Sequence, residues 1–144
     1  MLNLSETEKA WLACAIDGEG TIVFQPKKRQ DTQSGGGRTY IAIYNTNLSF
    51  VKRALDITQT GQIKFQPPKG KLGRKPYFYW MVGTRKACYE ILKQILPYLI
   101  IKQQEAGQII LFHEIRKYSN KPYNKAELAI LRGKYQIPLK VNKN

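Results

Sequence analysis

Hydrophobic positions along the chain switch between helical and strand spacing, and the switches predict a helix followed by two strands, twice over, and then further helices. Helices are predicted over about 5–17, 49–58, 84–96 and 100–117, and strands over 21–25, 38–44, 62–66 and 77–82. Ser5 and Glu8 form a capping box for the first helix, which Gly18 and Gly20 end. The order predicts an α+β fold of the αββαββα type, in which one four-stranded antiparallel sheet carries helices on one face.

The other face of this sheet is expected to be open, and the polar half of each strand would point to it. Its predicted members are Val23, Gln25, Lys27, Arg29, Arg38, Tyr40, Ala42, Tyr44, Gln62, Lys64 and Gln66, with Lys69 and Arg74 in the basic turn over 67–76. The strand over 77–82 is apolar on both sides, so either Tyr77, Tyr79 and Met81 or Phe78, Trp80 and Val82 face outward.

Such a face is chemically suited to nucleic acid. Gln and Arg make bidentate hydrogen bonds to adenine and guanine, and Lys and Arg neutralise phosphates. The alternative is an ordinary solvated sheet face. The charge of the chain favours nucleic acid, because 24 Lys and Arg against 10 Asp and Glu give a net charge of +14.

Other classes of protein are less compatible with this composition. No apolar stretch approaches the roughly 18 residues of a membrane span, and the N-terminus lacks the charged and apolar regions of a signal peptide. Cys14 and Cys88 lie alone in apolar helical patterns, so we expect two buried free thiols in a reducing compartment. In the helix over 100–117, Ile101, Ile109 and Ile115 are expected to face the core.

The most informative segment is Leu-Ala-Cys-Ala-Ile-Asp-Gly-Glu-Gly over 12–20. It places Asp17 and Glu19 at the C-terminal end of the first helix, where the helix dipole disfavours each carboxylate by roughly 0.3–1 kcal/mol. A compensating cation is therefore expected, and the segment is a candidate metal site. If this segment were not a functional motif, Glu19 would be a surface turn carboxylate, and Lys102, further along the chain, would be a solvated lysine near the start of a helix.

The segment over 12–20 resembles the signature of the LAGLIDADG homing endonuclease family, whose motif helix also ends in an acidic turn followed by a strand. The element order over about 4–117 resembles the core of that family as well. The chain has one copy of the motif, and single-motif members act as homodimers. The resemblance therefore implies a homodimer in which the motif helices pack together, through residues Leu12, Ala13, Ile16 and Asp17.

The resemblance also implies roles for individual residues. Glu19 matches the metal-binding carboxylate, and the carbonyl of Gly18 lies where a further ligand is often supplied. Asp17 matches an acidic residue that more often helps to organise the paired helix ends than holds metal. Lys102 resembles the active-site lysine, and Asn47 matches approximately a Gln that orders water. Two positions depart from the pattern: Cys14 replaces a Gly, and Val51 stands where a basic residue often follows.

The function that the resemblance implies is Mg²⁺-dependent hydrolysis of double-stranded DNA at a long pseudo-palindromic target, with two or more ions per dimer shared between the subunits. The core domain would span 1–118, and 119–144 would be a basic extension with a short helix. His113, the one histidine, is expected to be a structural helix residue rather than a general base. The expected location is an organelle or a microbial cytoplasm. The alternatives are an intron RNA maturase, which would bind its own intron RNA, and a DNA- or RNA-binding protein that does not cleave.

Overall fold

The computed structural model describes residues 2–26, 37–70, 75–116 and 125. The elements follow the predicted order, and their bounds lie within three residues of the predicted ones. They are α1 (Glu6–Glu19), β1 (Gly20–Pro26), β2 (Gly37–Asn45), α2 (Leu48–Thr58), β3 (Gln62–Gln66), β4 (Tyr77–Val82), α3 (Arg85–Ile95), the 3₁₀ turn η1 (Leu96–Tyr98) and α4 (Gln103–Arg116). The predicted α+β fold is confirmed.

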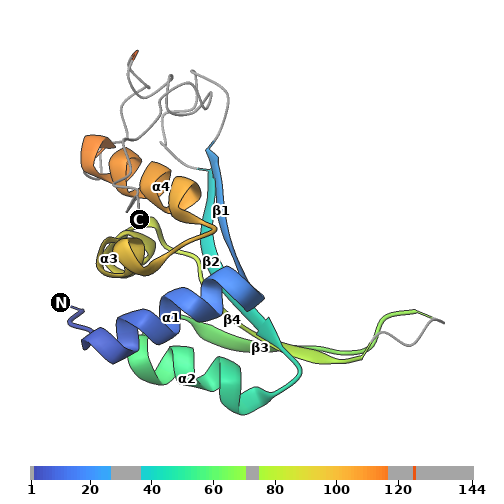
Figure 1. Cartoon of the computed structure of the whole chain (residues 1–144). Coiled ribbons are helices and arrows are strands. Elements are labelled where there is room, and N and C mark those ends of the chain that lie inside the picture. The colour runs from blue at the N-terminus through green and yellow to red at the C-terminus, as the bar shows by residue number, and fades with distance from the viewer. Residues whose placement is uncertain (1, 27–36, 71–74, 117–124, 126–144) are drawn as a thin grey trace.

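The strands form one antiparallel sheet in the order β1-β2-β4-β3. Helices α1 to α4 lie together on one side of this sheet (Figure 1). The core lies between the two layers, where Ile41, Ile43 and Trp80 of the sheet are fully buried with Ile91 and Leu92 of α3. The opposite face of the sheet carries none of the helices that the structure describes.

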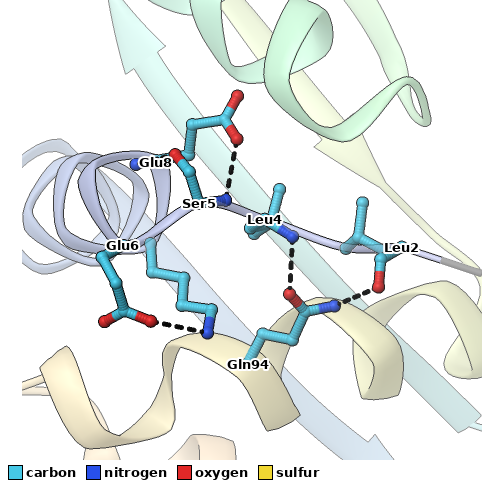
Figure 2. Close-up of polar contacts among 7 residues, drawn as sticks. Leu2, Leu4, Ser5, Glu6, Glu8 and Gln94 are labelled. Atoms are coloured by element: carbon cyan, nitrogen blue, oxygen red, sulfur yellow. Dashed lines mark hydrogen bonds and ion pairs between the residues drawn. The ribbon is translucent and has the colours of Figure 1, made fainter.

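The predicted capping box at the start of α1 is present, and it is tied to α3 (Figure 2). The backbone N–H of Ser5 donates to Glu8 Oε1 at 2.9 Å, and the N–H of Glu8 donates to Ser5 Oγ at 3.2 Å. The side-chain amide of Gln94 accepts from the Leu4 N–H at 2.9 Å and donates to the Leu2 carbonyl at 2.6 Å. These bonds fix the N-terminal segment against α3 and so fix where α1 begins.

The junction of α1 with β1 depends on Gly20. A Cβ atom at this position would lie 2.5 Å from the carbonyl oxygen of Ala42 and 2.9 Å from the Cα of Ile16. The residue is extended, with φ −123°, so the requirement for glycine comes from this close approach rather than from the backbone conformation. The end of the motif helix is therefore pressed directly onto β2.

Three details differ from the predictions. The last helix begins at Gln103 rather than at about residue 100, so Ile101 lies outside it and is 69% exposed. Ile115 is also exposed, at 37%, whereas Ile109 is buried as predicted. Cys14 is exposed and only Cys88 is buried. In the part of the chain that the structure covers, no helix combines the length and the apolar character needed to cross a membrane.

Candidate metal and nucleic-acid site

The carboxylate of Asp17 is bound by the segment that precedes α4. Its Oδ2 accepts from the Ile100 N–H at 2.7 Å, and its Oδ1 accepts from the N–H groups of Ile101 and Lys102 at 3.2 Å and 3.1 Å. These amides precede α4, which begins at Gln103, and the carboxylate satisfies donors that no helix pairs. Asp17 therefore joins the end of α1 to the segment before α4 of the same chain, while its expected role in organising the paired helix ends of two chains stays a prediction.

Lys102 makes the second bond of this junction. Its Nζ donates to the backbone carbonyl of Asp17 at 2.8 Å, and its own carbonyl accepts from the Ala106 N–H at 3.1 Å. Lys102 thus stands just before α4 rather than inside a helix. The ammonium group also places a positive charge at the negative end of the α1 dipole, where no basic residue lies in the last turn of α1 itself.

Glu19 differs from Asp17 although only one residue separates them. It is exposed, and its carboxylate makes no hydrogen bond or ion pair with any residue in the described ranges. The carbonyl of Gly18 is one of the last four of α1, which have no partner within a helix. The positive charge predicted to compensate the acidic turn is thus provided at Asp17 by backbone amides and by the nearby Lys102 ammonium. Glu19 has no such compensation among the described residues.

The oxygen donors at this turn fit a magnesium ion that also binds a phosphate substrate. The described ranges hold no group of three or more His, Cys, Asp or Glu side chains that could bind a metal ion. Mg²⁺ usually keeps several waters and takes one or two carboxylates together with substrate phosphates. Glu19 and the Gly18 carbonyl are hard oxygen donors of this kind.

Asn47 has a clear structural role. Its Oδ1 accepts from the Phe50 N–H at 3.2 Å and so caps α2, while its own N–H donates to Asn45 Oδ1 at 2.8 Å. The residue lies just past the end of β2 and is exposed. Val51, which stands where a basic residue often follows in the family, is fully buried. Its side chain therefore cannot take the place of that basic residue. A role of Asn47 in ordering water stays a prediction.

The residues predicted for the dimer interface need correction. Leu12, Ala13 and Ile16 are fully buried in the core of their own chain, so their side chains cannot contact a partner. The exposed side of α1 carries Ala10, Cys14 and Gly18, four residues apart. Helical motifs mix core-facing and outward-facing positions, and the sequence resemblance did not separate them.

The strand register places the predicted nucleic-acid residues on one face. Val23 pairs with Tyr40, Gln25 with Arg38, and Lys64 with Tyr79, which in turn pairs with Tyr44. Directly paired residues point to the same side of a sheet. Because Ile22, Ile41 and Trp80 face the core, this side is the open one. Gln66 lies on it, opposite Tyr77.

The same register settles which side of β4 is open. Tyr77, Tyr79 and Met81 lie on the open face, since Trp80 and Val82 are buried in the core. The alternation of polar and apolar residues could not show which side of β4 is open, because both sides of the strand are apolar. Lys69 is exposed in the connection from β3 to β4. The predicted residues Lys27, Arg29 and Arg74 lie outside the described residues, as does the extension over 119–144 apart from Lys125.

His113 is placed as a structural residue, as predicted. It is buried, and its ring stacks on Tyr89 with 4.2 Å between the ring centroids. Burial, together with the charge of Arg85, lowers the pKa of the imidazole. The histidine lies in α4, well along the helix from the junction at Lys102, so a role as general base at Glu19 has no support.

No family model and no curated protein matches the sequence. The fold is similar to that of solved homing endonucleases. I-CvuI, solved with the I-CreI target and magnesium, is 20% identical with a TM-score of 0.59, over 76% of this chain and 67% of I-CvuI. I-CeuI, encoded by a group I intron and solved with DNA, is 14% identical with a TM-score of 0.61, over 99% of this chain and 73% of I-CeuI.

The meganuclease I-SmaMI, solved on uncleavable DNA, is 17% identical with a TM-score of 0.62. The match covers 87% of this chain but only 43% of I-SmaMI, so this chain corresponds in extent to less than half of that protein. At these identities the likeness shows a shared fold.

Proposed function

We propose that this chain is a homodimeric, Mg²⁺-dependent endonuclease that hydrolyses double-stranded DNA at a pseudo-palindromic target. One observation carries the proposal. Of two carboxylates at the end of α1, Asp17 is bound by three backbone amides, whereas Glu19 is exposed and has no partner among the described residues. A carboxylate in this place is unfavourable for the helix, so its presence favours a role in binding a cation.

Glu19 and the carbonyl of Gly18 would hold the metal ions, two or more per dimer. When bound, Mg²⁺ would supply a water of lowered pKa and would neutralise charge on the phosphate oxygens. Lys102 would stabilise charge that develops on the phosphate. Its ammonium has three protons and gives one to the Asp17 carbonyl, so two remain for the substrate.

The open face of the sheet would hold the DNA. It carries the amide and basic side chains of Gln25, Arg38, Lys64 and Gln66 on one surface, and the chain has a net charge of +14. These groups suit base edges in the major groove and backbone phosphates. The structures of I-CvuI and I-CeuI, which share this fold, were each solved with DNA.

A second copy of the chain is proposed because the surface beside Glu19 is suited to a partner, whose own Glu19 would add a second carboxylate to the metal site. The exposed side of α1 is lined with small residues, which let two helices approach closely. Beside it, Ile100 and Ile101 are 85% and 69% exposed although they are large and apolar. Their amides bind Asp17, so they are held next to the end of α1, where a partner would cover them.

The test is incubation of the protein with a randomised duplex library in Mg²⁺, followed by sequencing of the cut ends. We expect a single pseudo-palindromic sequence, and we expect Glu19→Gln to lower the cleavage rate by at least about a hundredfold while duplex binding persists. Cleavage by Glu19→Gln at the wild-type rate would contradict the proposed metal site. Tight binding without cleavage by the wild-type chain would favour the maturase or binding-protein alternative.

A further inference from the structure

The centre of the open sheet face is made of rings and methyl groups rather than charged groups. Tyr44 and Tyr79 lie opposite each other on the two central strands, Tyr77 lies two residues from Tyr79, and Met81 lies two residues beyond Tyr79, opposite the fully buried Ala42. Lysine and glutamine side chains stand beside them on β3, and Gln25 and Arg38 lie at the far end of the β1–β2 pair. Polar and charged groups therefore lie on two sides of an apolar centre.

Three of these residues form a packed group, which we call the tyrosine cluster: Tyr44, Tyr77 and Tyr79. Their ring centroids are 5.8–6.3 Å apart, and the Tyr44 and Tyr77 rings meet edge to face. All three are half-buried. Their hydroxyls have no hydrogen-bond partner within the described ranges. Burial and the neighbouring tyrosines raise the pKa of Tyr44, so its phenol stays protonated.

We propose that the tyrosine cluster recognises thymine methyl groups in the major groove, so that the target contains an A·T-rich segment of about three base pairs in each half-site. This inference rests on the proposed function in that it requires duplex DNA on the open face. Side chains two residues apart on one side of a strand are separated by about 6.8 Å, or two base-pair steps. The cluster, from Tyr77 to Tyr79 along β4 with Tyr44 opposite Tyr79, therefore spans about two steps, or three base pairs.

The chemistry of the major groove favours thymine at this place. Thymine is the one base that presents a methyl group there, and apolar side chains contact it. A G·C pair presents as many polar groups in the groove as an A·T pair, but it has no methyl group. It would therefore lose water to the rings without gaining the apolar contact that thymine offers.

The packing of the cluster argues against unpaired bases as its ligand. A base that stacks on an aromatic side chain needs the flat face of the ring to be free. In the edge-to-face pair, one ring face is already covered by its neighbour. What the cluster offers a ligand is a set of apolar edges with hydroxyl groups, which suits the methyl groups on the wall of a duplex groove.

The experiment is selection of bound duplexes from a randomised library by the wild-type chain, with Ca²⁺ in place of Mg²⁺. We expect a run of A·T pairs in each half-site. Thymines in the run are then replaced one at a time by deoxyuridine, which removes only the methyl group. We expect the affinity to fall about fourfold for each methyl that the cluster buries.

Three variants test whether the cluster is the cause. Tyr79→Ser should bring the thymine-to-deoxyuridine affinity ratio close to one, whereas Tyr79→Phe, which keeps the ring, should preserve it. Lys64→Ala, next to Tyr79 on the same face, should weaken both duplexes equally. Circular dichroism and urea unfolding of each variant separate loss of recognition from loss of fold.

The outcomes distinguish the inference from the proposed function. Failure to bind any duplex would overturn both. Specific binding to a G·C-rich segment, or equal affinity for thymine and deoxyuridine, would overturn the inference and leave the endonuclease proposal intact. Tighter binding of single-stranded DNA or RNA of the same sequence would show that the cluster stacks unpaired bases instead.

Discussion

At the residue scale, the surroundings of Asp17 and Glu19 define the candidate site. The Asp17 carboxylate accepts three backbone hydrogen bonds, and the Asp17 carbonyl accepts a fourth from Lys102. Glu19 has none of these contacts in the described ranges. A side chain whose hydrogen bonds hold the fold together is expected to raise the free energy of unfolding. A charged side chain that is kept at an unfavourable position in order to bind a ligand is expected to lower the free energy of unfolding. The two roles therefore predict opposite effects on unfolding.

We expect Asp17→Ala to lower the free energy of unfolding by about 1–3 kcal/mol, because three amide donors lose a charged acceptor. We expect Glu19→Gln to leave it unchanged or to raise it by up to about 1 kcal/mol, because a negative charge leaves the C-terminal end of α1. The measurement is urea unfolding followed by the fluorescence of Trp11 and Trp80, at low ionic strength and one protein concentration.

Raised salt provides the control, since it screens the interaction of Glu19 with the helix dipole and should reduce the gain from Glu19→Gln. Destabilisation by Glu19→Gln as large as that by Asp17→Ala would show that the fold itself uses both carboxylates. The argument that Glu19 is kept for a metal ion would then fail.

At the scale of elements, the two glycines at the end of α1 have different surroundings. A Cβ atom on Gly20 would clash with the backbone of Ala42 and Ile16, so the packing of α1 on β2 requires this glycine. A Cβ atom on Gly18 would meet nothing within 4 Å. Glycine is a poor helix former, and no contact within the described residues explains why position 18 of the helix is a glycine. A close approach by a second molecule would explain it.

We therefore expect Gly20→Ala to destabilise the fold by about 2–4 kcal/mol, because backbone atoms must move. Gly18→Ala should stabilise a single chain by about 0.5 kcal/mol through helix propensity. It should also weaken dimerisation, because the added methyl group stands on the exposed side of α1. Unfolding at low protein concentration and sedimentation at higher concentration measure the two effects. A Gly18→Ala variant that dimerises as tightly as wild type would remove this residue from the interface.

The elements themselves were largely predictable, whereas their contacts were not. Local periodicity and turn residues determine β3 and β4, whose predicted bounds match the structure. The start of α4 was predicted too early, because Asp17, 83 residues away in sequence from Ile100, binds the amides before the helix. The same distant contact leaves Ile101 exposed. The open side of β4 depends on its register with β2, which an apolar strand does not encode locally.

At the scale of the whole molecule, a composite site requires that two chains meet at the ends of α1. A two-fold interface uses the same patch on both chains, so a residue near the axis faces its own copy. On the exposed side of α1, Cys14 lies midway between Ala10 and Gly18. If two copies of α1 pack along this side, the two Cys14 residues face each other. Cys88 offers an internal control, because it is fully buried and burial raises its pKa to about 12.

We expect mild oxidation with copper phenanthroline to produce a covalent dimer of the wild-type chain and none of Cys14→Ser. A disulfide forms only where the two Cα atoms come within about 7 Å, so the cross-link reports close helix packing. Cys14→Ser should remain a dimer by sedimentation, which separates the cross-link from the assembly. A dimer that does not cross-link would place the axis on another surface. A chain that sediments as a monomer even with its selected DNA would have one Glu19 per complex, and the composite metal site would be excluded.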